Sequence, residues 1–97
     1  SGAYPSGHAT AGTLMGIVLS NMVPEKRAEI MARAAEYANN RIVGGVHYRS
    51  DIETGRITGT VIAARLQARD DFNSAFDAAK KELRGVLELG ADPADNR

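Results

Sequence analysis

The residues best suited to chemistry in this 97-residue chain are a histidine and the charged side chains around it. His47 has Asp51 four residues after it and Arg41 six residues before it, with the pair Gly44-Gly45 between. A carboxylate can fix the tautomer of an imidazole and stabilise its positive charge, and a guanidinium can hold an anionic substrate. This pattern therefore predicts a nucleophilic histidine that acts on an anion.

The only other histidine, His8, directly follows the turn-forming segment Pro5-Ser6-Gly7. Ser6 stands at the N-cap position of a predicted helix, where free backbone N–H groups and the positive end of the helix dipole lie. A helix start of this kind binds phosphate readily. The sequence thus predicts two histidine-containing segments suited to an anionic substrate.

Each of these residues also has a purely structural interpretation. His47 could be a loop residue hydrogen-bonded to Asp51 for helix capping, with Arg41 in solvent, and His8 an ordinary residue of a first helical turn. A metal site is not expected, because two histidines far apart in the sequence with scattered carboxylates lack the ligand spacing of zinc sites.

Helices must position these residues, since apolar side chains recur at helical spacing and no alternating strand pattern is present. The predicted fold class is all-α, a helical bundle of about four helices. The first helix carries no charge and is expected to be buried on most sides. Residues 1–90 are expected to be helical overall and residues 91–97 to form a frayed tail. The predicted helices cover residues 8–22, 24–41, 50–68 and 72–90.

Two pairs of small residues stand at a spacing of four: Gly12 with Gly16, and Gly55 with Gly59. Each glycine inside a helix costs about 1 kcal/mol relative to alanine, so close approach of two backbones is a physical reason for them. We expect these pairs to form the contact between the first and third helices. That contact would bring both histidines to the same end of the bundle.

The composition narrows the class of protein. Twelve basic and twelve acidic side chains cancel, which gives no electrostatic reason to expect a nucleic acid or an anionic membrane surface as partner. Cysteine is absent, so disulfides and thiolate chemistry are excluded. No apolar run is long enough to span a membrane. A single soluble domain, or part of one, is expected.

Taken together, the segment Pro5-Ser6-Gly7-His8 and the pattern Arg41, His47 and Asp51 resemble the second and third signature motifs of bacterial class A non-specific acid phosphatases. These enzymes belong to the phosphatidic acid phosphatase type 2 and vanadium haloperoxidase superfamily. The 32 residues between His8 and Arg41 are compatible with this family. Two motifs in the right order and spacing are more specific than either alone.

The resemblance implies a metal-independent periplasmic phosphomonoesterase that needs no cofactor and works through a phosphohistidine. By this similarity His47 is the nucleophile, Asp51 orients it, and His8 is the general acid that protonates the leaving alcohol. The phosphoryl oxygens would be held by Arg41, Ser6 and the backbone N–H of Gly7. The ligands would be a phosphomonoester or inorganic phosphate.

The resemblance also implies a first motif, a lysine followed seven positions later by Arg-Pro, and no lysine of this sequence is followed by Arg-Pro at that spacing. The resemblance places that motif before the Pro-Ser-Gly-His segment. We therefore expect residues 1–97 to be the C-terminal portion of a larger all-α phosphatase domain, with the N-terminal part of the same protein as its partner. Weak or no activity is expected without that part, and self-association into a homo-oligomer is left open.

Three other functions compete with the acid phosphatase. A vanadium-dependent haloperoxidase would bind vanadate at His47, because vanadate mimics the phosphoryl transition state. A lipid phosphatase of the same superfamily would use membrane-spanning helices, against which the charged second and fourth helices argue. A non-catalytic helical interaction module would bind neither phosphate nor vanadate.

Overall fold

The computed structural model describes residues 7–43 and 49–96, with side chains placed for residues 7–39 and 51–94. Every regular element within these ranges is helical, which confirms the all-α class. The elements, in chain order, are α1 (Gly7–Met22), the 3₁₀ turn η1 (Pro24–Lys26), α2 (Arg27–Val43), α3 (Arg49–Gln67), α4 (Asp70–Val86) and the 3₁₀ turn η2 (Pro93–Asn96).

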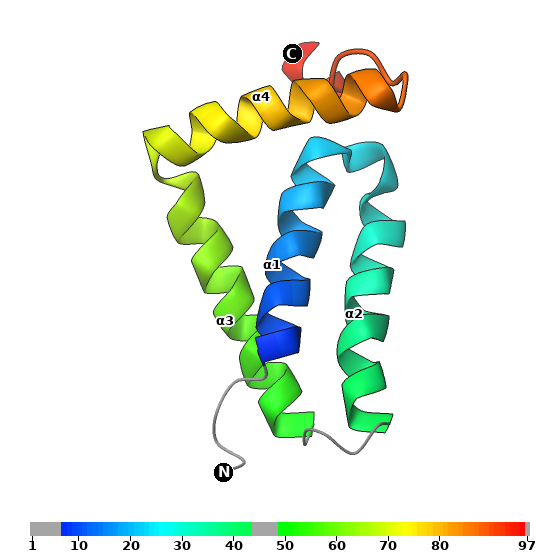
Figure 1. Ribbon diagram of the computed structural model, residues 1–97, viewed down its shortest axis with the longest axis vertical. Helices are drawn as coiled ribbons and strands as arrows, with labels where there is room; N and C mark the ends of the chain where they lie inside the picture. Colours follow the sequence, from blue (N-terminus) through cyan, green and yellow to red (C-terminus); the bar gives the residue numbers. More distant parts are fainter. Residues whose placement is uncertain (1–6, 44–48, 97) are drawn as a thin grey trace.

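Helix α1 occupies the centre, flanked on one side by α2 and on the other by α3 (Figure 1). Helix α4 lies across the end of the molecule at which α1 ends (Figure 1). Both flanking contacts are close because glycines line them. A Cβ at Gly16 would lie 3.0 Å from Cβ of Ala34 on α2, and a Cβ at Gly59 would lie only 2.6 Å from the carbonyl oxygen of Thr10 on α1. The absence of these side chains lets both neighbours approach the α1 backbone.

The glycine pairs therefore serve two contacts and not one. Gly59 packs against α1, as predicted, but Gly12 and Gly16 face α2, where Tyr37 and Ala34 lie against them. The expectation that Gly12 and Gly16 meet the third helix is wrong. The small residues that α1 presents on its other side include Thr13, whose Cβ lies 3.1 Å from the Cβ position at Gly59.

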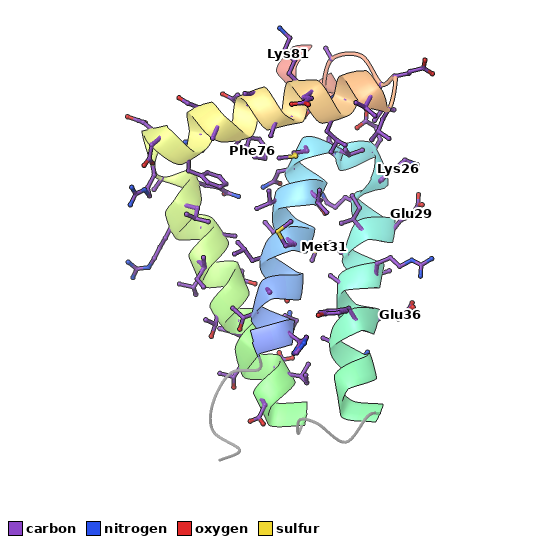
Figure 2. The ribbon with its side chains drawn as sticks, viewed as in Figure 1. Lys26, Glu29, Met31, Glu36, Phe76 and Lys81 are labelled. Atoms are coloured by element: carbon purple, nitrogen blue, oxygen red, sulfur yellow. The ribbon has the colours of Figure 1, made fainter. Side chains whose placement is uncertain are left out.

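Helix α1 is also less covered than its uncharged sequence predicted. Its buried residues include Ala9 and Ser20, both fully inaccessible. However, Met15 is 53% exposed and Leu19 is 36% exposed. Met31 reaches from α2 toward α1 (Figure 2), with its Sδ 3.2 Å from the Cβ position at Gly16. Within the described chain, α1 is thus covered on two sides and open along a third.

The C-terminal region is more ordered than the expected frayed tail. Helix α4 ends at Val86, and the chain reverses through positive φ angles at Glu88 (58°) and Gly90 (65°). Asp92 is only 5% exposed, and its Oδ2 accepts a hydrogen bond of 2.6 Å from Nζ of Lys80. Residues 91–96 therefore return onto α4 and form η2, where the sequence favoured solvated chain.

Candidate functional site

Three helix ends meet at the end of the molecule opposite α4 (Figure 1). They are the first turn of α1, the last turn of α2 and the first turn of α3. In the sequence these turns carry His8, Arg41 and Asp51. The fold thus gathers three segments, of which the first and the last lie 43 positions apart in the chain (His8 to Asp51).

A small apolar cluster holds these ends together. Ala9, Ala38 and Ile52 pack against one another, with exposures of 0%, 7% and 7%. Each of them is a near neighbour of a candidate site residue, because Ala9 follows His8, Ile52 follows Asp51, and Ala38 lies one turn before Arg41. The cluster fixes the relative positions of the three helical turns, and therefore the backbone positions of the candidate residues.

The first turn of α1 is open to solvent. Gly7 is its first residue, and both Gly7 and His8 are exposed. Among the residues that the structure describes, none outside this helical turn has an atom within 4 Å of a Cβ placed at Gly7. The free N–H groups of this turn and the helix dipole together favour an anion there.

Asp51 lies in the first turn of α3 and is only 5% exposed. A buried carboxylate is stable when hydrogen-bond donors surround it. The carboxylate at this point also interacts favourably with the positive end of the α3 dipole. Its burial beside the α1 start suits a residue that orients another group, and not a solvated surface charge.

Three predicted site residues lie outside the described part of the chain or are described only in part. Ser6 precedes the described residues, and His47 stands in the sequence between Val43, where α2 ends, and Arg49, where α3 begins. Arg41 is helical, but its side chain is not among those placed. The structure therefore places His8 and Asp51 fully, and Arg41 by its backbone.

One residue beside the candidate site was not singled out from the sequence. The ring of Tyr37 on α2 contacts the imidazole of His8, with 5.8 Å between the ring centroids and a tilt of 49°. In the sequence Tyr37 looked like one of several apolar positions of an amphipathic helix. Its position one turn before Arg41, on the same helix, was the available indication.

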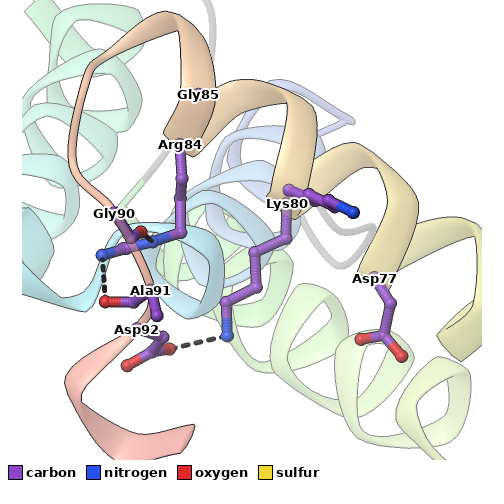
Figure 3. Close-up of a pocket in the computed structure, with 8 residues that line it drawn as sticks. Asp77, Lys80, Arg84, Gly85, Gly90, Ala91 and Asp92 are labelled. Carbon is purple, nitrogen blue, oxygen red and sulfur yellow. Dashed lines mark hydrogen bonds and ion pairs between the residues drawn. The ribbon is translucent and has the colours of Figure 1, made fainter.

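The other charged cluster of the described chain lies at the far end, around Arg84 of α4 (Figure 3). Arg84 is 4% exposed, and its guanidinium donates to both carboxylate oxygens of Glu25, at 2.8 and 2.6 Å. It also donates to four backbone carbonyls, those of Met22 at 3.1 Å, Leu89 at 3.4 Å, Gly90 at 2.7 Å and Ala91 at 3.1 Å. These hydrogen bonds join α4 to the end of α1, to η1 and to the C-terminal turn.

This arrangement has an electrostatic consequence for Glu25. The hydrogen bonds from Arg84 stabilise the charged carboxylate and lower its pKa to about 2. A hollow beside Arg84 is lined by both signs of charge, including Lys80, Lys81, Asp77 and Asp92. Since these charges largely balance, we assign this end of the molecule a structural role.

Two further observations bear on the class of protein. Among the described residues, no group of three or more His, Asp or Glu side chains gathers where a metal ion could bind. Of the helices described, none has the combination of length and apolar character needed to cross a membrane.

Comparison with known proteins shows the family of the chain. A family model described as the PAP2 superfamily matches residues 1–72. The chain is 40% identical over 89 residues to the non-specific acid phosphatase of Salmonella typhimurium, which covers 92% of this chain and 36% of that protein. The acid phosphatase of Zymomonas mobilis is 34% identical over 94 residues, or 97% of this chain and 36% of that protein. The non-specific acid phosphatase of Providencia stuartii is 34% identical over 83 residues, or 86% and 34%. The chain spans about a third of the length of these curated relatives.

Proposed function

Because this chain belongs to the PAP2 superfamily, we propose that it carries the catalytic histidines of an acid phosphatase that hydrolyses phosphomonoesters. The observation that carries the proposal is the meeting of the α1 start, the α2 end and the α3 start around Ala9, Ala38 and Ile52. That meeting brings the turns bearing His8, Arg41 and Asp51 to one end of the molecule. The names of the relatives, all acid phosphatases, favour this reaction over haloperoxidase chemistry.

In the proposed reaction His47 attacks the phosphorus atom, and the bond from phosphorus to the ester oxygen breaks as the bond to the imidazole nitrogen forms. The carboxylate of Asp51 accepts a hydrogen bond from the N–H on the other side of the His47 ring and stabilises the positive charge that develops on that ring. His8 gives its proton to the departing alcohol, then takes a proton from the water that hydrolyses the phosphohistidine. No metal ion is required by this scheme.

The phosphoryl oxygens are held, in this proposal, by the Arg41 guanidinium, by Ser6 and by the backbone N–H of Gly7. Phosphoryl transfer depends mainly on positioning and on donors aimed at the equatorial oxygens, where the transition-state charge spreads. The first turn of α1 supports this role, since Gly7 and His8 are both exposed in the described part of the chain.

We further propose that a segment outside these 97 residues completes the phosphate site with additional cations. The chain exposes 6513 Å², whereas a compact monomer of this mass exposes about 5,400 Å². Its radius of gyration is 15.0 Å, against about 13 Å for a compact domain of this length. The excess surface includes the open side of α1 at Met15 and Leu19, which a packed segment would cover. A periplasmic location stays a prediction from the family resemblance.

Hydrolysis of p-nitrophenyl phosphate in the presence of EDTA tests the proposal, on the chain alone and together with the segment that would complete it. We expect turnover in the completed protein that EDTA does not remove. Arg41→Met should abolish it, while Arg33→Met, which removes an 82% exposed arginine from the same helix, should leave it intact. Equal activity of both variants would overturn the assignment of Arg41. Absence of turnover and of vanadate binding in the completed protein would favour a non-catalytic helical module.

A further inference from the structure

The contact between His8 and Tyr37 joins two exposed side chains from different helices. His8 is exposed and Tyr37 is 46% exposed, so burial in a core does not force them together. Their ring centroids are 5.8 Å apart, within the range of an interacting aromatic pair. Another contact must therefore hold one of the two rings in place.

The fixed ring is that of Tyr37. One turn after His8, Gly12 leaves space on α1, and a Cβ at Gly12 would lie 3.0 Å from Cδ2 and 3.6 Å from Cε2 of Tyr37. The tyrosine ring thus rests on the α1 backbone. One turn further along, Gly16 admits Ala34 and Met31 in the same way, at 3.0 and 3.2 Å from its Cβ position. The tight α1–α2 contact consequently sets where the Tyr37 ring stands.

A general acid must present one ring nitrogen to the leaving oxygen at hydrogen-bond distance. An exposed histidine in a first helical turn has several rotamers, and only some of them point its ring nitrogen at a substrate over the helix start. A fixed aromatic ring on one side removes the rotamers that would occupy the same space. Such pre-positioning raises the rate because less freedom is lost in reaching the transition state.

We propose that Tyr37 is a positioning residue for His8, acting through its aromatic ring and not through its hydroxyl group. This inference rests on the proposed phosphatase function for its kinetic consequence, and on the described geometry for the contact itself. The ring should matter most where proton donation by His8 matters most. That condition holds for esters whose alcohol is a poor leaving group.

The kinetic test compares two substrates and two variants in the completed, active protein. Phenyl phosphate needs a proton on its leaving oxygen far more than p-nitrophenyl phosphate does, and kcat/KM reports the step in which that bond breaks. We expect Tyr37→Leu to lower kcat/KM about tenfold for phenyl phosphate and less than about twofold for p-nitrophenyl phosphate. Tyr37→Phe should keep both values within about twofold, since the ring remains.

Leu19→Ala provides the matched control, because Leu19 is an exposed apolar residue of the same α1–α2 groove, three turns from His8. It should leave the ratio between the two substrates unchanged. Equal losses of Tyr37→Leu on both substrates, or the same loss in Tyr37→Phe, would overturn the positioning role.

A second readout does not depend on activity. The ring current of Tyr37 should shift the imidazole proton resonances of His8 in the NMR spectrum of the 97-residue chain. Those resonances should move in Tyr37→Leu and stay in Tyr37→Phe and Leu19→Ala; unchanged resonances in Tyr37→Leu would overturn the contact. A shift in Tyr37→Leu, combined with no turnover by the completed wild-type protein, would instead count against the proposed function alone.

Discussion

Gly59→Ala is an informative perturbation of the α1–α3 contact, because among the described glycines Gly59 leaves the least room for a Cβ. The added Cβ would lie 2.6 Å from the carbonyl oxygen of Thr10, 3.1 Å from Cβ of Thr13 and 3.2 Å from the backbone nitrogen of Leu14. Two of these atoms belong to the α1 backbone, which cannot rotate away as a side chain could. To reach the 3.4 Å of ordinary contact with the Thr10 oxygen, α3 and α1 must separate locally by about 0.8 Å.

The magnitude follows from two opposing terms. Overpacking a close contact costs about 1–3 kcal/mol, and the higher helix propensity of alanine returns about 1 kcal/mol. Because the shortest contact is with backbone, we expect the upper part of the cost and a net loss of about 2 kcal/mol. For a domain of this size, such a loss lowers Tm by about 8–16 °C.

Gly85→Ala is the matched control. Gly85 lies within α4, and a Cβ there would meet no atom within 4 Å. This variant should gain about 0.5 kcal/mol in the free energy of unfolding, because only the helix propensity changes. Urea denaturation followed by circular dichroism measures both variants against the wild type. A Gly59→Ala protein as stable as Gly85→Ala would refute the α1–α3 contact as described.

Three other predictions concern stability. The pKa of Glu25 is about 2 in the folded chain and 4.5 ordinarily. The charged carboxylate therefore adds to the free energy of unfolding fully above pH 4.5, and this addition is lost as the pH falls from about 4.5 to about 2. Glu25→Gln should therefore be less stable than wild type in urea denaturation at pH 6, with the gap closing toward pH 2; a constant gap would contradict the pairing with Arg84. Arg84→Met should cost about 3 kcal/mol or more, because it removes the partner of Glu25 and the donor to four backbone carbonyls. Lys81→Met, at an exposed position of α4, should change the free energy of unfolding by less than about 0.5 kcal/mol; similar values for both variants would refute the structural role of Arg84. Ser20 is fully buried, and its Oγ has no hydrogen-bond partner among the described residues; Ser20→Ala should raise the free energy of unfolding by up to about 1 kcal/mol, and a loss of that size would show that the hydroxyl is bonded.

The helical fold could be predicted because the sequence contains clear helix breaks and helical spacing of apolar residues. Pro24 marks the break between the first two helices, and it begins η1 in the structure. Apolar spacing also gave the fourth helix, whose start at Asp70 lies two residues before the predicted one. These local features depend on residues close in the chain, which is why the sequence suffices for them.

Features that depend on distant residues were not predicted correctly. Which helix Gly12 and Gly16 face is decided by whether Tyr37 and Ala34 or other side chains fill the space beside them. The return of the C-terminal turn depends on Lys80 and Arg84 finding carboxylates and carbonyls across the molecule. Spacing along the chain contains no direct information on either pairing.

For the candidate site, motif order and spacing selected the candidate residues, and the fold brings three of the helical turns that carry them to one end of the molecule (Figure 1). The turns of His8, Arg41 and Asp51 come together because Ala9, Ala38 and Ile52 pack beneath them. Small apolar residues of this kind are unremarkable in a sequence. The roles of His47 and Ser6 stay predictions, since both lie outside the described residues.

The most direct test of the central claim is to trap the phosphoryl group on the enzyme. The completed protein would be mixed with a phosphomonoester, quenched in alkali, where phosphohistidine survives, and digested for mass spectrometry. We predict one added phosphoryl group on the peptide that contains His47, its loss on acid treatment, and its absence in His47→Ala. A phosphoryl group on another residue, or turnover by His47→Ala at the wild-type rate, would contradict the account.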